Sequence, residues 1–239
     1  MNPKAMILAA GLGTRLRPVT NTIPKALVAV GGITLLERSI LHLASCGVKE
    51  IIINVHHFAG QIIEFLDKKK NFGLAISVSD ESGQLLDTGG GLKKAAWFFD
   101  DGNPFIVRNV DVISDLDLRA MLDYHIQSRA LATLAVRTRE TSRYFLFDAD
   151  HRLCGWTNIK TGEKVVCFEP PVNPEMMAFS GIQVVDPAIF PLILEEGSFS
   201  LTQLYLRLAK DQLIKGYLDG SAVWKDVGKS LADLMEPIT

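Results

Sequence analysis

Glycine and basic residues are concentrated directly after the first apolar segment of the chain. Residues 8–25 read L-A-A-G-L-G-T-R-L-R-P-V-T-N-T-I-P-K. Gly11 and Gly13 permit a tight turn and bring backbone N–H groups close to a ligand. Arg15 and Lys25 add positive charge beside that turn. A core strand needs none of these features, so we expect this segment to bind a polyphosphate.

The spacing of the glycines differs from two common phosphate-binding motifs. Position 16, where a dinucleotide-binding motif has its third glycine, is Leu16, and the pattern G-x-x-x-x-G-K is missing. Pro18 and Pro24 follow closely and disfavour a helix at this point. The segment is therefore predicted to be a long irregular loop, and the missing third glycine argues against a dehydrogenase.

Two aspartates stand where predicted strands should end. Asp111 follows P-F-I-V-R-N-V, and Asp226 follows A-V-W-K. Chemistry between phosphates brings highly negative groups together, and Mg²⁺ held by carboxylates is the usual means of neutralising them. Although the two residues are far apart in sequence, both can lie at one edge of a sheet.

The acidic run D-V-I-S-D-L-D-L (111–118) imitates the D-x-D motif of metal-dependent glycosyltransferases. Capping is the simpler interpretation, because Asp and Ser side chains accept hydrogen bonds from the first free N–H groups of a helix. We expect Asp115, or Ser114 before it, to cap the helix that follows.

Alternating strands and helices supply the scaffold that these side chains need. The predicted strands of the first half are 5–10, 50–55, 74–79 and 104–110, and the helices between them are 33–47, 60–70 and 88–99. Strands separated by helices at this spacing form parallel crossover connections. The fold class is thus α/β, with a Rossmann-like, mixed but mainly parallel central sheet flanked by helices.

The first three strands of the second half are predicted to be antiparallel additions to the same sheet, because long helices do not separate them. The predicted strands are 130–138, 143–148, 164–169, 177–185 and 222–227, and the helices are 187–196, 200–213 and 229–236. The sequence contains no repeat and no low-complexity linker, so a single domain over residues 1–239 is expected.

Composition limits the class of partner. The 239 residues are 48% hydrophobic and 22% charged, with a formal net charge of −2. A broad basic field for nucleic acid or an anionic membrane is not expected, nor is a membrane span of about 20 apolar residues. Cys46, Cys154 and Cys167 are odd in number and far apart, which disfavours a disulfide framework and fits a reducing cytoplasm.

The string in residues 8–25 resembles the opening signature of sugar-1-phosphate nucleotidyltransferases. The similarity is greatest to the short bacterial N-acetylmuramate-1-phosphate uridylyltransferase and mannose-1-phosphate guanylyltransferase types, and it covers nearly the full chain. It implies the nucleotide-diphospho-sugar transferase fold and a Mg²⁺-dependent reaction of a nucleoside triphosphate with a sugar 1-phosphate, releasing pyrophosphate. The chain ends soon after its last predicted helix, so the β-helix domain of longer relatives is not expected.

The same resemblance implies roles for individual residues. Arg15 would stabilise the leaving pyrophosphate, and Lys25 would bridge the reacting phosphates. The segments N-V-D (109–111) and W-K-D-V-G (224–228) match metal-binding segments of the family, so Asp111 and Asp226 would hold the metal. The nucleotide would be bound by Leu8, Ala9, Ala10, Gly11, Gly13, Thr14, Glu81 and Gly89, and the sugar by Asn109, Asn158, Ser180 and Gly181.

Departures from the family pattern concern the sugar and the base. Val110 replaces a glycine of the family and should alter backbone contact there. A Glu-Lys pair that grips the sugar in many relatives is missing; Asn158 or, with an offset, Glu169-Pro170 are its alternatives. Glycines 89–91 are expected to lie against a flat base whose edge Glu81 reads, and Asn54 is expected to shape the site.

Several alternatives stay open from the sequence. UTP with N-acetylmuramate 1-phosphate or GTP with mannose or heptose 1-phosphate is favoured, while glucose 1-phosphate and phosphocholine are further acceptors to test. A metal-dependent glycosyltransferase would not need Arg15 or Lys25. A non-catalytic nucleotide-sugar sensor would not need these two cations together with Asp111 and Asp226. Oligomeric state is not readable from the sequence.

Overall fold

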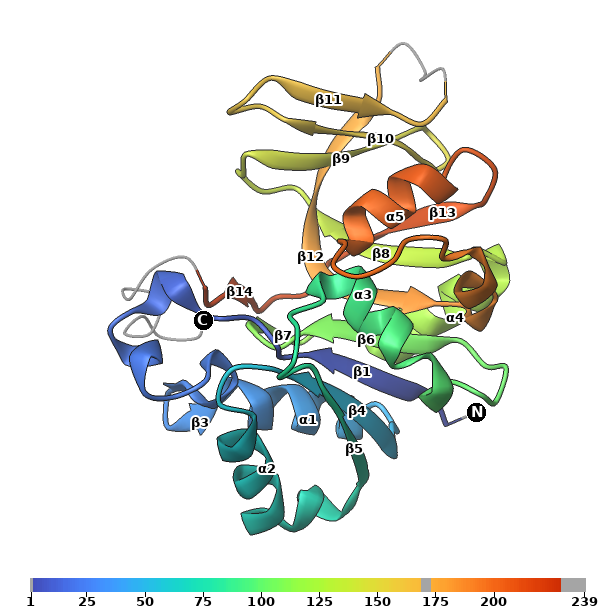
Figure 1. The fold of residues 1–239 in the computed structure, drawn as a ribbon. Helices are drawn as coiled ribbons and strands as arrows, with labels where there is room; N and C mark the ends of the chain where they lie inside the picture. Colours follow the sequence, from blue (N-terminus) through green and yellow to red (C-terminus); the bar gives the residue numbers. More distant parts are fainter. Residues whose placement is uncertain (1, 169–172, 229–239) are drawn as a thin grey trace.

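A large mixed sheet forms the centre of the protein, and helices pack against both of its faces (Figure 1). The structure, a computed structural model, describes residues 2–168 and 173–228. Within these ranges ten strands form the sheet, in the order β11-β10-β9-β12-β6-β1-β4-β5, with β8 beside β12 and β13 beside β8. The strands are β1 (Lys4–Leu8), β4 (Glu50–Val55), β5 (Ala75–Asp80), β6 (Phe105–Asn109), β8 (Ala132–Arg137), β9 (Arg143–Phe147), β10 (Leu153–Asn158), β11 (Glu163–Val166), β12 (Glu175–Val185) and β13 (Ile214–Leu218).

The half of the sheet that contains β6, β1, β4 and β5 is parallel. Leu8 at the end of β1 is in register with Asn54 on β4 and with Asn109 on β6. The carboxyl ends of three strands therefore lie side by side, which is where ligands bind in open α/β sheets.

The other half of the sheet is mainly antiparallel, as predicted from the lack of long helices between its first strands, but β13 pairs parallel with β8. β12 pairs antiparallel with β6 through its C-terminal half and with β9 through Glu175–Met177. Its pairing with β8 shifts in register between Phe179 and Gln183, and Gly181 within that stretch has a φ of +83°. This irregular point of β12 adjoins the strand ends described above.

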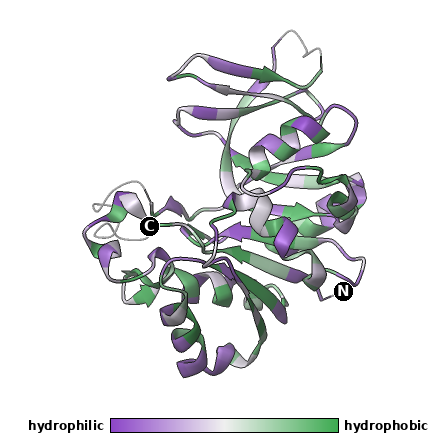
Figure 2. Ribbon diagram, viewed as in Figure 1, coloured by the Kyte–Doolittle hydropathy of each residue, from purple (hydrophilic) through white to green (hydrophobic). Residues whose placement is uncertain are grey.

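The helices cover the sheet on both faces, because successive residues of a strand point to opposite sides. On β1, Ile7 belongs to one core and Met6 to the other. Ile40 of α1 packs in the first core and Leu204 of α5 in the second, and Figure 2 shows hydrophobic residues along the central strands. The helices are α1 (Leu35–Ser45), α2 (Ala59–Lys68), α3 (Asp87–Lys94), α4 (Leu118–Ser128) and α5 (Leu201–Leu208). In the described part of the chain, no helix has the length and apolarity needed to cross a membrane.

Two small sheets lie outside the central one. β2 (Ala29–Val30) pairs with β3 (Ile33–Thr34), and β7 (Val112–Ser114) pairs antiparallel with β14 (Trp224–Asp226). The strand predicted at 222–227 therefore does not extend the central sheet; it joins the chain that leaves β6. This pairing brings the second predicted aspartate to the first.

Other expectations for single elements were wrong. The segment predicted as a helix at 187–196 forms a 3-10 helix over Pro187–Leu192, because Pro191 inside it removes a backbone donor. α4 is capped by Asp117, whose carboxylate accepts hydrogen bonds from two backbone N–H groups, and not by Asp115 or Ser114. Strands β10 and β13 were not predicted. The predicted helix 229–236 and the Glu169-Pro170 alternative lie outside the described residues.

Candidate active site

Asn54 organises the point where the glycine-rich loop leaves β1. Its Oδ1 accepts a hydrogen bond from the Ala9 N–H at 2.7 Å, and its Nδ2 donates to Glu81 Oε1 at 2.7 Å. On the opposite side, the Val110 N–H donates to the Leu8 carbonyl at 3.1 Å. Asn54 thus shapes the site, as the sequence predicted.

The predicted irregular loop is present and its turn depends on Gly13. This residue has a φ of +63°, and its carbonyl accepts hydrogen bonds from the Leu16 N–H at 2.9 Å and Thr20 Oγ1 at 2.8 Å. The N–H groups of residues 11–13 donate to no group of the described chain. Consecutive unpaired N–H groups make a concavity suited to an anion.

A first cavity of about 500 Å³, which we call the loop cavity, opens between this loop and the start of α3. Arg15 is exposed beside it, whereas Lys25 is buried. Eight residues predicted from the loop line it together with residues 85, 87 and 88 on the α3 side. They are Leu8, Ala9, Ala10, Gly11, Gly13, Thr14, Arg15 and Lys25 on the loop side, with Leu85, Asp87 and Thr88 opposite.

The triple glycine of α3 packs closely against neighbouring elements. The Gly89 N–H donates to the Phe199 carbonyl at 2.8 Å, and a β-carbon on Gly89 would collide with the Phe199 ring. A β-carbon on Gly91 would lie 2.7 Å from Glu81 Oε1. These glycines let α3 approach its neighbours closely, while Asp87 and Thr88 border the loop cavity.

Glu81, which the sequence predicted to read the base, is buried and hydrogen-bonded to neighbouring residues. The residue is 1% exposed and does not line the loop cavity. One carboxylate oxygen accepts from Asn54, and the other accepts from the Leu86 N–H at 3.2 Å. Through Asn54, this carboxylate fixes the Ala9 N–H and with it the start of the loop.

The two predicted metal ligands lie together at the β7–β14 pair. The Val227 N–H donates to the Asp111 carbonyl at 2.9 Å, which binds the end of β14 to the turn after β6. A β-carbon on Gly228 would lie 3.1 Å from Asp111 Oδ2 and 3.2 Å from Asp226 Oδ1. Lys25 Nζ forms an ion pair with the Asp111 carboxylate. Both carboxylates and the lysine therefore meet around one small residue.

This donor set fits Mg²⁺. Among the described residues there is no group of three or more His, Cys, Asp or Glu side chains that could hold a metal, so Asp111 and Asp226 would be the only carboxylate ligands there. Mg²⁺ is commonly bound by one or two carboxylates together with substrate phosphates and water. The pair also adjoins the anion-binding loop, where phosphates would complete the shell.

A buried cation supports the turn that carries Asp111. Arg108 is 1% exposed, donates to the Val112 carbonyl at 2.5 Å and contacts His42 Nδ1 at 2.7 Å. Burial lowers the pKa of Arg108 to about 10, so it stays charged at neutral pH. Burial and the nearby Arg108 charge lower the pKa of His42 to about 4. His42 is therefore neutral, and its Nε2 lies 3.0 Å from the Leu116 carbonyl.

Val110 does not disturb the strand. Its side chain is 5% exposed in the core, and its backbone N–H pairs with β1. The backbone here does not adopt a positive φ. The predicted change is thus confined to a side chain on the wall of the loop cavity.

A second cavity of about 860 Å³, the strand cavity, lies on the antiparallel side and shares Arg15, Asn109 and Asp111 with the first. Gly181 is required there, because a β-carbon would lie 2.5 Å from Val112 Cγ2. All four residues predicted for the sugar line this cavity, and so does Asp226; the four are Asn109, Asn158, Ser180 and Gly181.

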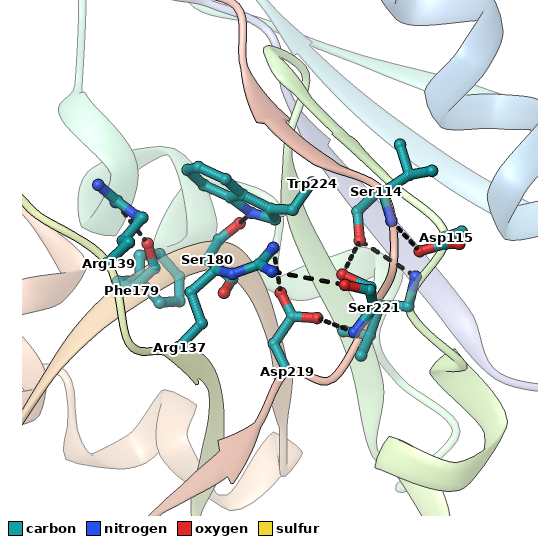
Figure 3. Close-up of polar contacts among 11 residues, drawn as sticks. Ser114, Asp115, Arg137, Arg139, Phe179, Ser180, Asp219, Ser221 and Trp224 are labelled. Atoms are coloured by element: carbon teal, nitrogen blue, oxygen red, sulfur yellow. Dashed lines mark hydrogen bonds and ion pairs between the residues drawn. The ribbon is translucent and has the colours of Figure 1, made fainter. Parts of the chain in front are cut away.

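Several residues of the strand cavity were missed by sequence reasoning. Figure 3 shows part of this region: Trp224 Nε1 donates to the Ser180 carbonyl at 2.9 Å, and the guanidinium groups of Arg137 and Arg139 lie over the indole ring. Trp224 belongs to the W-K-D-V-G segment, but no motif marks the others, since they come from different strands and loops. The missed lining residues include Arg139, Thr141, Arg143, Phe145, Trp156, Lys160, Phe179 and Trp224.

Comparison with known families decides the class of the protein. The family model described as nucleotidyl transferase matches residues 4–237. The chain belongs to this family. It is a sugar-1-phosphate nucleotidyltransferase, as the sequence predicted from its opening loop.

The nucleotidyltransferase has relatives with different substrates in their names. It is 34% identical over 236 residues to N-acetylmuramate alpha-1-phosphate uridylyltransferase of Caulobacter vibrioides, covering 96% of this chain and 93% of that one. It is 34% identical over 231 residues to mannose-1-phosphate guanyltransferase of Yarrowia lipolytica, covering 95% of this chain but 61% of the longer relative. The structure of UDP-glucose pyrophosphorylase from Acinetobacter baumanii has the same fold, with a TM-score of 0.78, 20% identity and coverage of 98% and 91%.

Proposed function

We propose that the protein is a Mg²⁺-dependent uridylyltransferase whose acceptor is N-acetylmuramate 1-phosphate. The observation that carries this proposal is that two cavities share Asp111, which lies beside Lys25 and Asp226; one cavity contains the glycine-rich loop and the other has space for a sugar. The choice of substrates is supported by the Caulobacter vibrioides relative, which this chain covers almost end to end.

The reaction proposed is an in-line displacement. A phosphate oxygen of the acceptor attacks the α-phosphorus of UTP, a new P–O bond forms, and the bond to pyrophosphate breaks. Negative charge is spread over the phosphoryl oxygens, so catalysis is mainly positioning and electrostatics. No nucleophilic side chain is needed.

Each charged residue has a distinct part in this step. N–H groups of Gly11 and Gly13 bind the triphosphate, and Arg15, exposed at the boundary of both cavities, stabilises the leaving pyrophosphate. Lys25 is 9% exposed and lies beside Asp111, so its charge acts where little water screens it. From there it neutralises the phosphates that react.

Asp111 and Asp226 would hold Mg²⁺. The ion would supply charge neutralisation at the α-phosphate. Lys25 now balances Asp111, and in the loaded enzyme the same ammonium is available to the substrate phosphates. From the same proposed substrates we infer that the protein acts in the cytoplasm and supplies a precursor of the cell envelope.

GTP with mannose 1-phosphate is the second candidate, because the Yarrowia lipolytica relative is also 34% identical to this chain, over 231 residues. The base is expected to lie near Leu85–Thr88, which border the loop cavity. These residues offer no feature that by itself separates uracil from guanine.

Pyrophosphate release tests the proposal. The protein is incubated with Mg²⁺ and each of UTP, GTP, CTP, ATP and dTTP against N-acetylmuramate, mannose, heptose and glucose 1-phosphates and phosphocholine. We expect the highest kcat/KM for UTP with N-acetylmuramate 1-phosphate. A higher value for any other pair contradicts the substrate assignment, and Mg²⁺-independent release contradicts the metal role.

A further inference from the structure

The strand cavity is lined by three basic side chains in addition to Arg15, which is the one proposed to act on the phosphates. They are Arg139, Arg143 and Lys160. Within the described residues, none of these three forms an ion pair with a carboxylate. Cations left without ion pairs in a concave site favour an anionic ligand.

Arg139 is held in place but keeps free donors. Its guanidinium carbon lies 4.6 Å from the Trp224 ring centre, and its Nη2 donates to the Phe179 carbonyl at 3.1 Å (Figure 3). Its Nε and Nη1 have no hydrogen-bond partner in the described chain. Trp224 is itself anchored to Ser180. A stacked guanidinium with unused donors loses little freedom when it binds a planar anion.

Arg143 and Lys160 stand at one end of the β9–β10 hairpin. Arg143 begins β9 and is in register with Asn158, and the Lys160 N–H donates to Asn158 Oδ1 at 3.1 Å. Trp156, two residues before Asn158 and on the same face of β10, also lines the cavity. The hairpin therefore presents two cations and an aromatic wall to a ring bound against β12.

The carboxylates that line this cavity are Asp111 and Asp226, and both would be engaged as ligands of the metal. A sugar hydroxyl both donates and accepts hydrogen bonds, whereas an ionised carboxylate only accepts them. Arg and Lys side chains cannot accept hydrogen bonds. Three unpaired cations with no further carboxylate among the described lining residues therefore suit an acidic group better than hydroxyls.

We propose that Arg139, Arg143 and Lys160 form a subsite for a carboxylate on the sugar ring of the acceptor, separate from its phosphate. The inference rests on the proposed function, because it places the sugar in the strand cavity. It adds specificity-determining residues to that function: the subsite selects sugars that bear a carboxylate over neutral sugars with the same ring.

Direct binding of a matched pair of acceptors tests the subsite without turnover. N-acetylmuramate 1-phosphate is compared by calorimetry with its lactamide, in which the carboxylate is a neutral amide. We expect the acid to bind roughly 10-fold to 100-fold more tightly, as for charge-assisted hydrogen bonds. Equal affinity, or no binding of either compound, overturns the subsite.

Single substitutions place the effect on the hairpin. Both Arg143 and Lys160 are exposed, so Arg143→Gln and Lys160→Gln are expected to fold. Each should reduce the acid-to-amide affinity ratio roughly fivefold to tenfold. The control is Lys164→Gln, an exposed lysine on β11 outside the cavity lining, which should leave the ratio unchanged. An unchanged ratio in both hairpin variants overturns the subsite.

The two proposals fail in different ways. If pyrophosphate release is fastest with another acceptor while the acid still binds more tightly than the amide, the substrate assignment fails and the subsite stands. If N-acetylmuramate 1-phosphate is the best acceptor but its amide binds equally well, the subsite alone is overturned.

Discussion

The loop cavity and the strand cavity are built in opposite ways. One continuous segment, residues 8–25, supplies half of the residues that line the loop cavity, including two cations. The strand cavity is assembled from the ends of β6, β9 and β10, the middle of β12, and β14, and long side chains form much of its wall. The difference suits their tasks: phosphates are common to all substrates of the family, whereas the sugar varies.

The two cavities share the end of β6 and the turn that follows it. Asn109 ends β6, Asp111 lies in the turn after it, and both line the two cavities. Arg108, immediately before them, is buried and binds the Val112 carbonyl. The geometry of the turn after β6 therefore affects the nucleotide side and the acceptor side together.

Lys25→Met should have the largest effect, because it removes a buried charge where both sides meet. We expect kcat for pyrophosphate release to fall by roughly 10²–10³, as for loss of one transition-state donor. Lys68→Met, on the exposed face of α2, is the matched control and should retain full activity. A loss of less than about threefold, well below the effect of a transition-state donor, contradicts the catalytic role.

Asp226→Asn should weaken the metal site while leaving the nucleotide loop intact. The Mg²⁺ concentration for half-maximal activity should rise by at least roughly tenfold, because mutating even a residue that only supports a metal ligand lowers metal affinity by about that factor. Asp67→Asn on the exposed side of α2 is the control. An unchanged Mg²⁺ requirement would remove Asp226 from the metal site.

Gly89→Ala and Gly11→Ala separate packing from ligand approach. A β-carbon at Gly89 collides with Phe199, so unfolding free energy should fall by about 1–3 kcal/mol. At Gly11 a β-carbon would contact nothing within 4 Å, so stability should change by less than about 0.5 kcal/mol while UTP affinity falls. Both quantities come from chemical denaturation and calorimetry. A Gly89→Ala protein that keeps its stability but binds UTP more weakly would indicate that Gly89 contacts the base.

His42, which contacts Arg108 beside the turn after β6, should make the free energy of unfolding depend on pH. Because the folded protein holds the pKa of His42 near 4, the unfolded chain binds more protons between pH 6.5 and 4. Unfolding free energy therefore decreases as pH falls through this window. Between pH 7 and pH 5 the wild type should lose about 1–2 kcal/mol more than His42→Gln. Identical pH dependence in the two proteins contradicts a buried neutral His42.

The loop cavity was largely predictable from sequence, and the comparison explains why. Gly13, Arg15 and Lys25 lie in one segment after a strand, so their types and spacing carry local information. The surroundings of Glu81 and Gly89 were not predicted, because Asn54 and Phe199 come from other elements. Sequence alone does not show whether a glycine faces a ligand or a phenylalanine.

The strand cavity was predictable where a strand end or the resemblance supplied a signal. Asp226 was found from its place after a predicted strand, and Ser180 and Gly181 from the resemblance, whereas Arg139 and Lys160 were not found. β10 was not recognised as a strand, so the hairpin that presents Lys160 was missing from the expected fold. Its role depends on pairing between distant strands, which periodicity does not reveal.

The central claim is that nucleotide and sugar occupy separate cavities that meet at Asp111. A crystal structure of the protein with bound UDP-N-acetylmuramate tests it most directly. The account predicts uridine beside Leu85–Thr88, phosphates at Arg15 and Lys25, and the sugar against Trp156. A sugar bound within the loop cavity, or anywhere away from the β9–β10 hairpin, would contradict it.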